Sequence, residues 1–544
     1  MPGAGKMNRA VRGTLSLTVI AMLLLMVLAS HGAAATPSDE ARRILSATGV
    51  EGGLIVHLEC GDGQLTAALR ADERYVVEGL DKDEKDVARA RNRLHAEGLY
   101  GAVTVQHWDG ESLPYADNMI NLIVAGKDST VAEAEMMRAL APGGVCYANV
   151  GGKWDKTVKP WPEEMDDWSH YLQDSGNNAV ANDSMIGPPR RLRWKCGPLW
   201  ARSHEFNSSV AALVSAGGRI FYVFDKGITS LTDEPIPTEW TLVARDAFNG
   251  VLLWEKPLEK WNAEGWRNQA LRAIPREVPR RLVAAGDRLF LTLGYDDSPV
   301  TVFDAASGER LRDCRKTEGT REIRFTGGVL LCRVAGKGNQ STIRALDPET
   351  EELLWETEEQ RMANNTFAAR NEEVYYVGHD GKKTVLRCVG LNDGEEVWQI
   401  PLSGNIMNLV VEDGKVVMLE RHGVRVLTAG NGEELWSEKS KFRTSLTQRQ
   451  DVFVMNDTVW YGDEHHEVVG RDLKTGKLKS RVKPEEVLSL GHHPRCYRSK
   501  ATENYIITPF RGVEFISVTG AEHAQCDWTR GACRYGVMPA NGLL

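Results

Sequence analysis

The sequence predicts a multidomain chain in which an α/β doubly wound domain precedes an all-β propeller of seven or eight blades. Three observations lead to this fold class. The 544 residues exceed what one hydrophobic core supports, so two or more domains are expected. Residues 54–150 alternate strand-like and helix-like segments, which is typical of a mostly parallel sheet. From residue 190 onward a turn pattern recurs about every forty residues, as the short strands of propeller blades do.

The α/β domain is predicted one element at a time. An early helix is expected with Ser38 as its N-cap, because a serine hydroxyl can accept from the free amides of the first turn. Short apolar runs then indicate five strands, and the amphipathic segments between them indicate helices. The expected strands are 54–58, 75–80, 103–107, 119–125 and 145–150, and the expected helices are 64–70, 85–98 and 131–140.

Special residues fall at the carboxyl ends of the first two strands. The glycine-rich turn Glu59-Cys60-Gly61-Asp62-Gly63 follows the first strand, and Asp81 ends the second. Such a turn lets a ligand approach the backbone, and an acidic residue about 20 positions later can hold ribose hydroxyls. The pattern predicts a nucleotide-type site at this edge of the sheet.

The same stretch resembles a known enzyme family. Residues 57–66 look like the first motif of the class I S-adenosylmethionine-dependent methyltransferases, and residues 137–144 are similar to the run into their fifth strand. The resemblance implies a Rossmann-like methyltransferase fold that binds S-adenosylmethionine, with Asp81 at the ribose and Asp109 beside the adenine. The cofactor-binding residues implied in this way are Glu59, Cys60, Gly61, Asp62, Gly63, Asp81 and Asp109.

Two positions depart from the family motif. His57 stands where the family has an acidic residue, and Glu59 replaces the first glycine, which adds bulk and negative charge at a tight turn. No catalytic base is identified after the fourth strand, so catalytic residues stay unassigned. We expect this domain to serve as a structural or binding module, and methyl transfer to an unknown acceptor is the enzymatic alternative.

The second half of the chain carries the pattern Asp-x-x-x-Gly-x-x-x-Trp in six degenerate copies and a looser seventh. The turn should join the last two strands of each blade, because glycine permits a positive φ there. The aromatic residue four positions later is expected to stack between adjacent sheets. The glycine position of the successive copies is occupied by Gly250, Gly308, Glu351, Gly394, Gly432, Gly476 and Gly520.

These copies resemble the tryptophan-docking repeat of two propeller families. Residues 344–356 and 427–438 are similar to repeats of pyrroloquinoline-quinone-dependent alcohol dehydrogenases and of the non-enzymatic propeller lipoprotein of the outer-membrane assembly machinery. Together the two domains look like proteins of planctomycete-type bacteria. The quinone enzymes use adjacent cysteines, which this sequence lacks, so pyrroloquinoline quinone is not expected as a cofactor. A quinone-dependent dehydrogenase is the second alternative.

The first 35 residues predict export. Basic residues precede an uncharged run from residue 13 to 30, and Ala33-Ala34-Ala35 offers a cleavage site before Thr36. An uncleaved anchor is the alternative, and it would be the chain's only contact with a membrane. The expected location is the periplasm or cell envelope. The net charge of −9 argues against a nucleic-acid partner, and a protein or saccharide ligand is expected on the propeller face.

A boundary separates the domains where periodicity disappears after residue 150. Within it Asp166, His170 and Asp174 could suggest a metal or catalytic cluster, but a single histidine among aromatic residues is expected to be a packed anchor. By the resemblance, this stretch is the lead-in that packs against the propeller disc.

No metal site is predicted near the carboxyl end. His492, His493 and Cys496 place donors in one loop, but the side chains of adjacent histidines diverge. The sequence ends without a recognisable closing strand, so a missing continuation of the propeller is expected. The predicted boundaries are 1–35 for the signal peptide or anchor, 36–155 for the α/β domain, 156–189 for the linker and lead-in, and 190–544 for the propeller.

Overall fold

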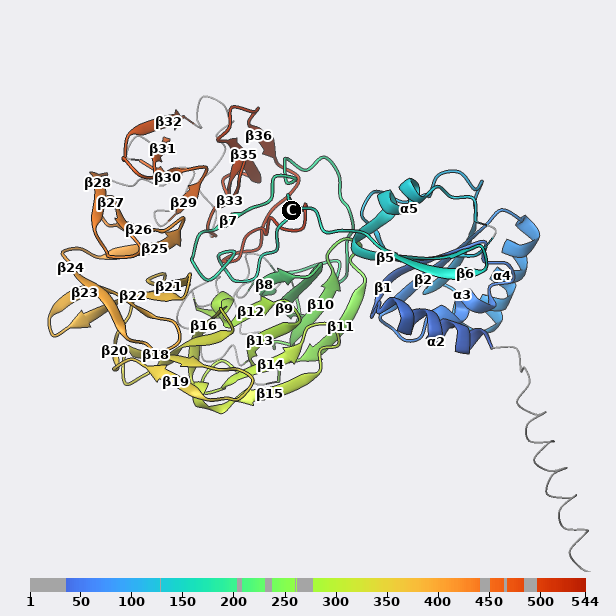
Figure 1. Cartoon of the computed structure of the whole chain (residues 1–544), viewed down its shortest axis with the longest axis horizontal. Coiled ribbons are helices and arrows are strands. Elements are labelled where there is room, and N and C mark those ends of the chain that lie inside the picture. Colours follow the sequence, from blue (N-terminus) through green and yellow to red (C-terminus); the bar gives the residue numbers. More distant parts are fainter. Residues whose placement is uncertain are drawn as a thin grey trace, which may run out of the picture.

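The computed structural model forms two bodies side by side, an α/β domain and a wide β-disc (Figure 1). The residues that the structure describes are 36–127, 129–202, 208–229, 237–259, 261, 277–440, 451–463, 467–483 and 497–544. The predicted leader, and the donors at 492, 493 and 496, lie outside these ranges. Across the described ranges, no helix combines the length and hydrophobicity that crossing a bilayer requires.

The α/β domain is built on a six-stranded sheet with the order β3-β2-β1-β4-β5-β6. The first five strands are parallel, and β6 runs antiparallel to β5. The expectation of five strands is therefore wrong, because the sequence of β6 is largely polar and exposed and gives no apolar signal. The strands are β1 (Gly53–Leu58), β2 (Tyr75–Asp81), β3 (Val103–His107), β4 (Ile120–Ala125), β5 (Leu140–Val150) and β6 (Lys153–Val158).

Helices cover both faces of this sheet. The helices α2 (Pro37–Thr48), α3 (Gln64–Leu69) and α4 (Glu84–Ala96) pack on one face, and α5 (Glu133–Ala139) packs on the other. The first helix begins two residues earlier than expected, because Thr36 and not Ser38 is its N-cap, and the Thr36 hydroxyl accepts from the Asp39 amide. The covered faces leave the two edges of the sheet, where strands begin and end, for contacts with other groups.

The disc is a propeller of seven blades, which confirms the predicted fold class (Figure 1). Each blade has four antiparallel strands in sequence order, and the first strands of neighbouring blades contact each other around the centre. The first blade consists of β8 (Val210–Ala216), β9 (Arg219–Asp225), β10 (Trp240–Asp246) and β11 (Leu252–Pro257), and the second of β12 (Leu282–Ala285), β13 (Arg288–Thr292), β14 (Val300–Asp304) and β15 (Arg310–Cys314). The third consists of β16 (Thr320–Thr326), β17 (Val329–Ala335), β18 (Gln340–Leu346) and β19 (Leu353–Glu356), with β20 (Gln360–Arg361) paired to β18. The fourth consists of β21 (Phe367–Arg370), β22 (Glu373–Asp380), β23 (Lys383–Gly390) and β24 (Glu396–Leu402).

The last three blades have the same order of four antiparallel strands. They are β25 (Ile406–Glu412), β26 (Lys415–Glu420), β27 (Gly423–Thr428) and β28 (Glu434–Lys439); β29 (Val452–Met455), β30 (Thr458–Gly462), β31 (Val468–Asp472) and β32 (Leu478–Val482); and β33 (Lys500–Thr502), β34 (Tyr505–Thr508), β35 (Val513–Ser517) and β36 (Ala524–Cys526). A short lead-in strand, β7 (Val180–Ala181), pairs in parallel with β33.

A recurring tryptophan joins the first, third, fourth and fifth blades to the blade that follows each of them. The ring of Trp254 in the first blade covers Gly308 of the second, and its Nε1 donates to the Ala305 carbonyl at 3.0 Å. A side chain on that glycine would enter the ring, since its Cβ would lie 2.5 Å from the indole. The same arrangement recurs for Trp355 on Gly394, Trp398 on Gly432 and Trp436 on Gly476.

The lead-in segment, residues 165–194, runs along the innermost strands of all seven blades in its first half. One backbone amide from each of these strands donates to it, in blade order, over residues 168–179. Because each bond is worth roughly 1 kcal/mol, the set ties the blades to one chain segment. The donors and acceptors are Ser215 to the Trp168 carbonyl, Ala284 to the Ser169 carbonyl, Phe325 to His170 Nε2, Ala369 to the Ser175 carbonyl, Val411 to the Gly176 carbonyl, Val454 to Asn178 Oδ1 and Ala501 to the Ala179 carbonyl.

The lead-in also supplies the docking tryptophan for the first blade. Trp194 lies on Gly250 as the other tryptophans lie on their glycines, and its Nε1 donates to the Ala247 carbonyl at 2.9 Å. No blade strand carries Trp194, so at the junction of the seventh and first blades a loop residue fills the position that an outer strand fills elsewhere. We call this junction the seam.

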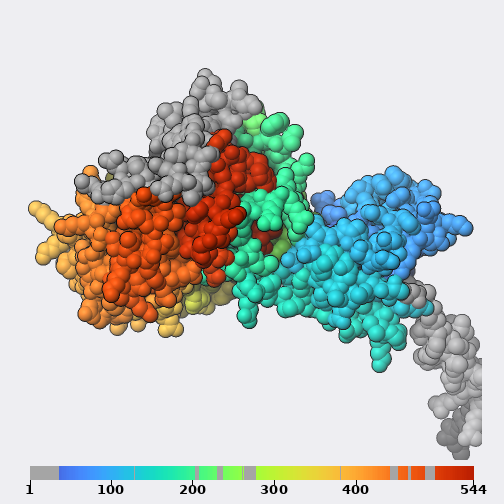
Figure 2. Space-filling model, turned by 90° about the horizontal axis from the view of Figure 1, so that it is seen from above, coloured from blue at the N-terminus to red at the C-terminus, as the bar shows by residue number. Residues whose placement is uncertain are grey.

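The propeller contacts the amino edge of the α/β sheet, where β1 and β4 begin. Asn121 on β4 donates to the Asp246 carboxylate at 2.7 Å, and Asn249 Nδ2 donates to Asn121 Oδ1 at 2.8 Å. Arg193 of the lead-in donates to the Asn118 carbonyl at 2.8 Å. Figure 2 shows the two bodies in contact through this side. The carboxyl edge of the sheet, where ligands of α/β folds bind, lies at the opposite ends of the strands.

Candidate functional site

The glycine-rich turn after β1 has the backbone geometry of a ligand-binding turn. Glu59, Gly61 and Gly63 all adopt positive φ, at 49°, 58° and 79°. Gly63 has no room for a side chain, because a Cβ would lie 2.8 Å from Ala90 on α4. Glu59 takes the left-handed conformation without the freedom of glycine, which costs roughly 1 kcal/mol. The turn therefore has the conformation of the family motif although Glu59 stands at the position of its first glycine.

Asp81 lies beside this turn, as the sequence predicts. Its Oδ2 accepts from the Gly61 amide at 2.8 Å, and its Oδ1 accepts from the Asp83 amide at 2.9 Å. Each carboxylate oxygen keeps a second lone pair, so Asp81 could still accept from a ribose hydroxyl. Asp109 is exposed at the end of β3, and its Oδ1 accepts from the Glu111 amide at 3.0 Å. The structure therefore brings together the two ends that the resemblance assigns to ribose and adenine.

The side chain of Lys82 lies between the positions that the resemblance assigns to the ribose and to the adenine. Its Nζ donates to Thr130 Oγ1 at 2.8 Å and lies 5.7 Å from the centre of the Trp108 ring. The Lys82 stem packs on Gly110, where a Cβ would be 2.0 Å from its Cε. The Glu59 carboxylate approaches the same ammonium at 4.0 Å. A lysine and a glutamate of the chain itself thus occupy the mouth of the predicted cofactor site.

The other predicted site residues hold the turn in place. Burial raises the pKa of the Cys60 thiol to about 12, so it is a neutral packing group. Asp62 accepts from Gln64 and from Arg93 on α4, and those hydrogen bonds lower its pKa. Buried His57 bonds to Thr66 Oγ1 at 2.9 Å, and burial lowers its pKa to about 4, so it is neutral. His57 and Asp62 are thus bound by other groups of the chain, and the Cys60 thiol is buried.

S-adenosylmethionine therefore fits the described residues only in part. The Asp81 carboxylate and the turn amides suit the ribose end of such a cofactor. The position of Lys82 against Trp108 and Gly110 obstructs the turn that would hold the adenine. Sequence reasoning identified Asp81 and Glu59 but missed Lys82, because a lysine that follows a strand has no distinguishing signal.

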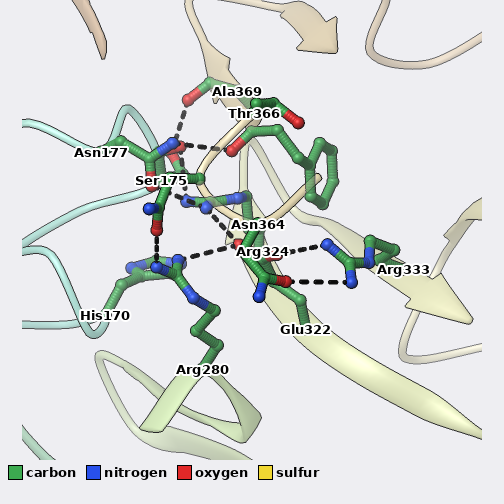
Figure 3. A network of polar contacts seen from close by, with 12 residues as sticks. His170, Ser175, Asn177, Arg280, Glu322, Arg324, Arg333, Asn364, Thr366 and Ala369 are labelled. Atoms are coloured by element: carbon green, nitrogen blue, oxygen red, sulfur yellow. Dashed lines mark hydrogen bonds and ion pairs between the residues drawn. The ribbon is translucent and has the colours of Figure 1, made fainter. Parts of the chain in front are cut away.

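A second polar cluster lies at the inner strands of the propeller (Figure 3). Glu322 on β16 is ion-paired with three arginines, Arg324 at 2.6 Å, Arg280 at 3.3 Å and Arg333 at 3.7 Å. Burial acts to raise the pKa of Glu322, but the three guanidinium groups outweigh it and hold that pKa below its usual value. All four side chains are buried, so the cluster is an enclosed ion network.

This network binds the lead-in to the blades. Arg324 donates to the Ser175 carbonyl at 2.9 Å and to Asn177 Oδ1 at 2.8 Å (Figure 3). His170 Nε2 accepts from the Phe325 amide, so its proton is on Nδ1, and burial lowers its pKa to about 3. The histidine is a packed anchor, as the sequence predicts. Among the described residues, no three His, Cys, Asp or Glu side chains come together as metal ligands would.

A smaller ion cluster lies where the lead-in contacts the fourth and fifth blades. The Arg370 guanidinium pairs with both Asp174 of the lead-in and Glu412 of β25. Burial raises the pKa of both carboxyls, and for Glu412 it raises the pKa to about 7. Two carboxylates share one cation here, so one of them is protonated close to neutral pH. This titrating group gave no signal in the sequence.

Family models match two stretches of the chain. Residues 55–144 match the model described as a methyltransferase domain, and residues 339–483 match the model of the outer membrane protein assembly factor BamB. Both predicted resemblances are therefore confirmed, one in each body of the structure. No curated protein matches the chain significantly.

Solved structures resemble single parts of the chain. BamB from Moraxella catarrhalis is 12% identical over 59% of this chain and 85% of its own, with a TM-score of 0.38. A europium-containing methanol dehydrogenase is 11% identical over 68% of this chain and 86% of its own, with a TM-score of 0.44. A putative S-adenosylmethionine-dependent methyltransferase from Methanococcus maripaludis is 21% identical over 28% of this chain and 69% of its own, with a TM-score of 0.20.

Proposed function

We propose that the chain is an exported binding or scaffold protein of the cell envelope that recognises its ligand through the propeller. The methyltransferase-like domain serves in it as a docked structural module. The observation that carries this proposal is the path of Lys82, which lies over Trp108 and bonds to Thr130 across the carboxyl edge. An adenine could reach its turn only after that hydrogen bond and the contact with Glu59 were broken.

The structure of the domain interface supports the same role. The α/β domain is held to the first blade by the half-buried side chain of Asn121 and the buried side chain of Asp246, with Asn249 beside them. Such contacts fix one domain on the other, which a structural module requires. The propeller, in turn, has its inner strands closed by the lead-in, so ligand recognition falls to its loops and its seam.

Methyl transfer is the second candidate, and one observation favours it. Asp81 keeps the carboxylate geometry at the end of β2, with Gly61 across from it, in the stretch that matches the methyltransferase model. The quinone-dependent alternative has less support. The buried carboxylate of Glu322 at the inner strands is already bound by three guanidinium groups, so it is poorly placed to hold a metal for a quinone.

Titration of the purified chain from Thr36 to Leu544 with S-adenosylmethionine and S-adenosylhomocysteine tests the proposal. Calorimetry should detect no binding at micromolar cofactor. Micromolar binding that the Asp81→Ala variant loses would overturn the proposal and favour methyl transfer as the function.

Export is tested separately, because the leader lies outside the described residues. The full-length chain should be recovered from the periplasm or envelope fraction, and mass spectrometry should find its amino terminus at Thr36. Retention of the whole chain in the cytoplasm would contradict this part of the proposal.

A further inference from the structure

We infer that the seam between the seventh and first blades binds a single-chain amphipathic anion, an alkyl carboxylate. The inference rests on the proposed binding role of the propeller and names the ligand class. A cavity of about 680 Å³ lies at the seam, between the lead-in, the first blade and the carboxyl-terminal segment. This volume falls within the usual range for small-molecule sites. In Figure 2 the green lead-in and the red carboxyl-terminal segment lie against each other.

The cavity exists because the seam closes differently from other junctions. Where Trp254, Trp398 and similar residues connect blades, the tryptophan belongs to an outer strand that is hydrogen-bonded into its own blade. At the seam, Trp194 comes from the lead-in and has no strand around it. Leu213 and Ile220 of the first blade and Tyr505 of the seventh therefore line an open space.

The walls of this cavity suit an apolar body. Large hydrophobic side chains gather at it even where they are exposed, including Leu192 at 69% and Trp528 at 53%. A gathered apolar patch around a hollow is the usual mark of a binding site, whereas single exposed hydrophobic residues are ordinary. The side chains that would contact an alkyl chain include Met185, Leu192, Leu213, Ile220, Trp528 and Met538.

Two arginines among the residues that line the cavity have no carboxylate partner in the described part of the chain. Arg190 and Arg191 line the cavity and are exposed, and no described carboxylate forms an ion pair with either guanidinium. Arg193 differs, because it donates to carbonyls of Phe248 and Asn118 and holds the domains together. On a chain with a net charge of −9, two neighbouring arginines without a described carboxylate partner favour an anionic head group. A guanidinium binds a carboxylate with two parallel hydrogen bonds.

An alkyl chain fits this lining better than a peptide does. Each peptide unit brings an N–H and a C=O that must be hydrogen-bonded once they leave water. The lining of the cavity is mostly apolar side chains, with Thr529 and Asn541 as its uncharged polar side chains and Arg190, Arg191 and Arg193 as its cations. An alkyl carboxylate needs no polar partner along its body and one cationic partner at its end.

Calorimetric titration of the Thr36-to-Leu544 chain with octanoate, decanoate and dodecanoate, each below its micelle concentration, tests the inference. We expect one site per chain and an affinity that rises about fourfold for each added methylene, as burial of CH₂ groups predicts. Dodecanol, which lacks the charge, should bind about tenfold more weakly than dodecanoate.

Three variants locate the site. Arg190→Ala with Arg191→Ala should weaken dodecanoate binding about tenfold, and Met538→Trp should abolish it by filling the cavity. Trp200→Ala is the matched control, because Trp200 is 73% exposed and outside the cavity. Thermal unfolding verifies that each variant is folded.

Three outcomes would overturn the inference. They are absence of dodecanoate binding, affinity that does not change with chain length, and equal binding by the wild type and both cavity variants. Binding to anionic phospholipid vesicles without binding of monomeric dodecanoate would also overturn it, in favour of a membrane surface. All four leave the cofactor titration of the proposed function untouched, so the two can fail separately.

Discussion

At the scale of single residues, the cluster around Arg370 contributes to the dependence of the propeller's stability on pH. Glu412 and Asp174 both pair with Arg370, and burial raises the pKa of Glu412 to about 7. The folded chain then holds a proton that the unfolded chain releases above its ordinary pKa of 4.5. Stability from this group is therefore present below about pH 4.5 and is lost as the pH rises through 7.

Glu412→Gln should remove this pH dependence, because glutamine resembles the protonated acid and cannot ionise. Between pH 5 and pH 8, the free energy of unfolding of the wild type should fall by up to about 3 kcal/mol more than that of the variant. Urea denaturation at the two pH values measures the difference. Buried His57 and His170 titrate in both proteins, so their effects cancel in the comparison. Equal pH dependence of the two proteins would refute the assignment.

Single residues also mark how far the sequence could predict the site. Asp81 and Gly61 lie together as their spacing predicts, because a turn after one strand and the end of its parallel neighbour meet at one edge. The effect of Glu59 was foreseen only as added bulk and charge. Its partner Lys82 could not be predicted, since the path of a long side chain depends on Thr130 and Trp108, which lie elsewhere in the sequence.

At the scale of elements, the repeat works as a pair of positions in successive blades. A tryptophan ring needs a glycine beneath it, and Gly308 beneath Trp254 is one example. The second blade has Arg312 at the tryptophan position, and the third blade has Glu351 at the glycine position, so both partners change together. Arg312 pairs instead with Glu349 of the third blade at 2.8 Å. The repeat of about forty residues could be predicted from the sequence, but the ion pair between the second and third blades could not.

The lead-in is the element whose role the sequence revealed least. Hydrogen bonds from backbone amides and from polar side chains such as Asn177 determine its path along the seven blades. These groups follow no periodic pattern in the sequence. Asn177 Nδ2 donates to the carbonyls of Phe367 and Leu409, at 2.8 and 3.0 Å, and its Oδ1 accepts from Arg324. One buried amide thus connects the fourth and fifth blades to the ion network of the third.

Asn177→Ala should destabilise the propeller by roughly 3 kcal/mol, because it leaves two buried carbonyls and a guanidinium without this partner. The matched control is Asn182→Ala, since the Asn182 side chain is exposed and only its backbone amide is used. Urea denaturation followed by tryptophan fluorescence compares the two variants. If both variants unfolded at the same urea concentration, the lead-in would not be the element that connects the blades.

At the scale of the whole molecule, the domains meet at the amino edge of the α/β sheet, opposite the edge where α/β folds usually bind ligands. Asn121 at the start of β4 lies between Asp246 and the amide of Leu54, so the contact uses the amino ends of the strands. The carboxyl edge therefore faces away from the propeller, and among the described residues Glu59 and Lys82 lie across it. Fold class and domain order could be read from the sequence. The docking could not, because Asn121 and Asp246 are 125 residues apart and follow no motif.

On our proposal, Glu59 and Lys82 keep the methyltransferase-like domain from binding S-adenosylmethionine or S-adenosylhomocysteine. Calorimetric titration of the Glu59→Gly, Lys82→Ala double variant with S-adenosylhomocysteine, beside the wild type, tests it most directly. The account predicts micromolar binding by the double variant, lost again when Asp81→Ala is added, and no binding by the wild type. Equal micromolar binding by the wild type and the double variant would contradict it.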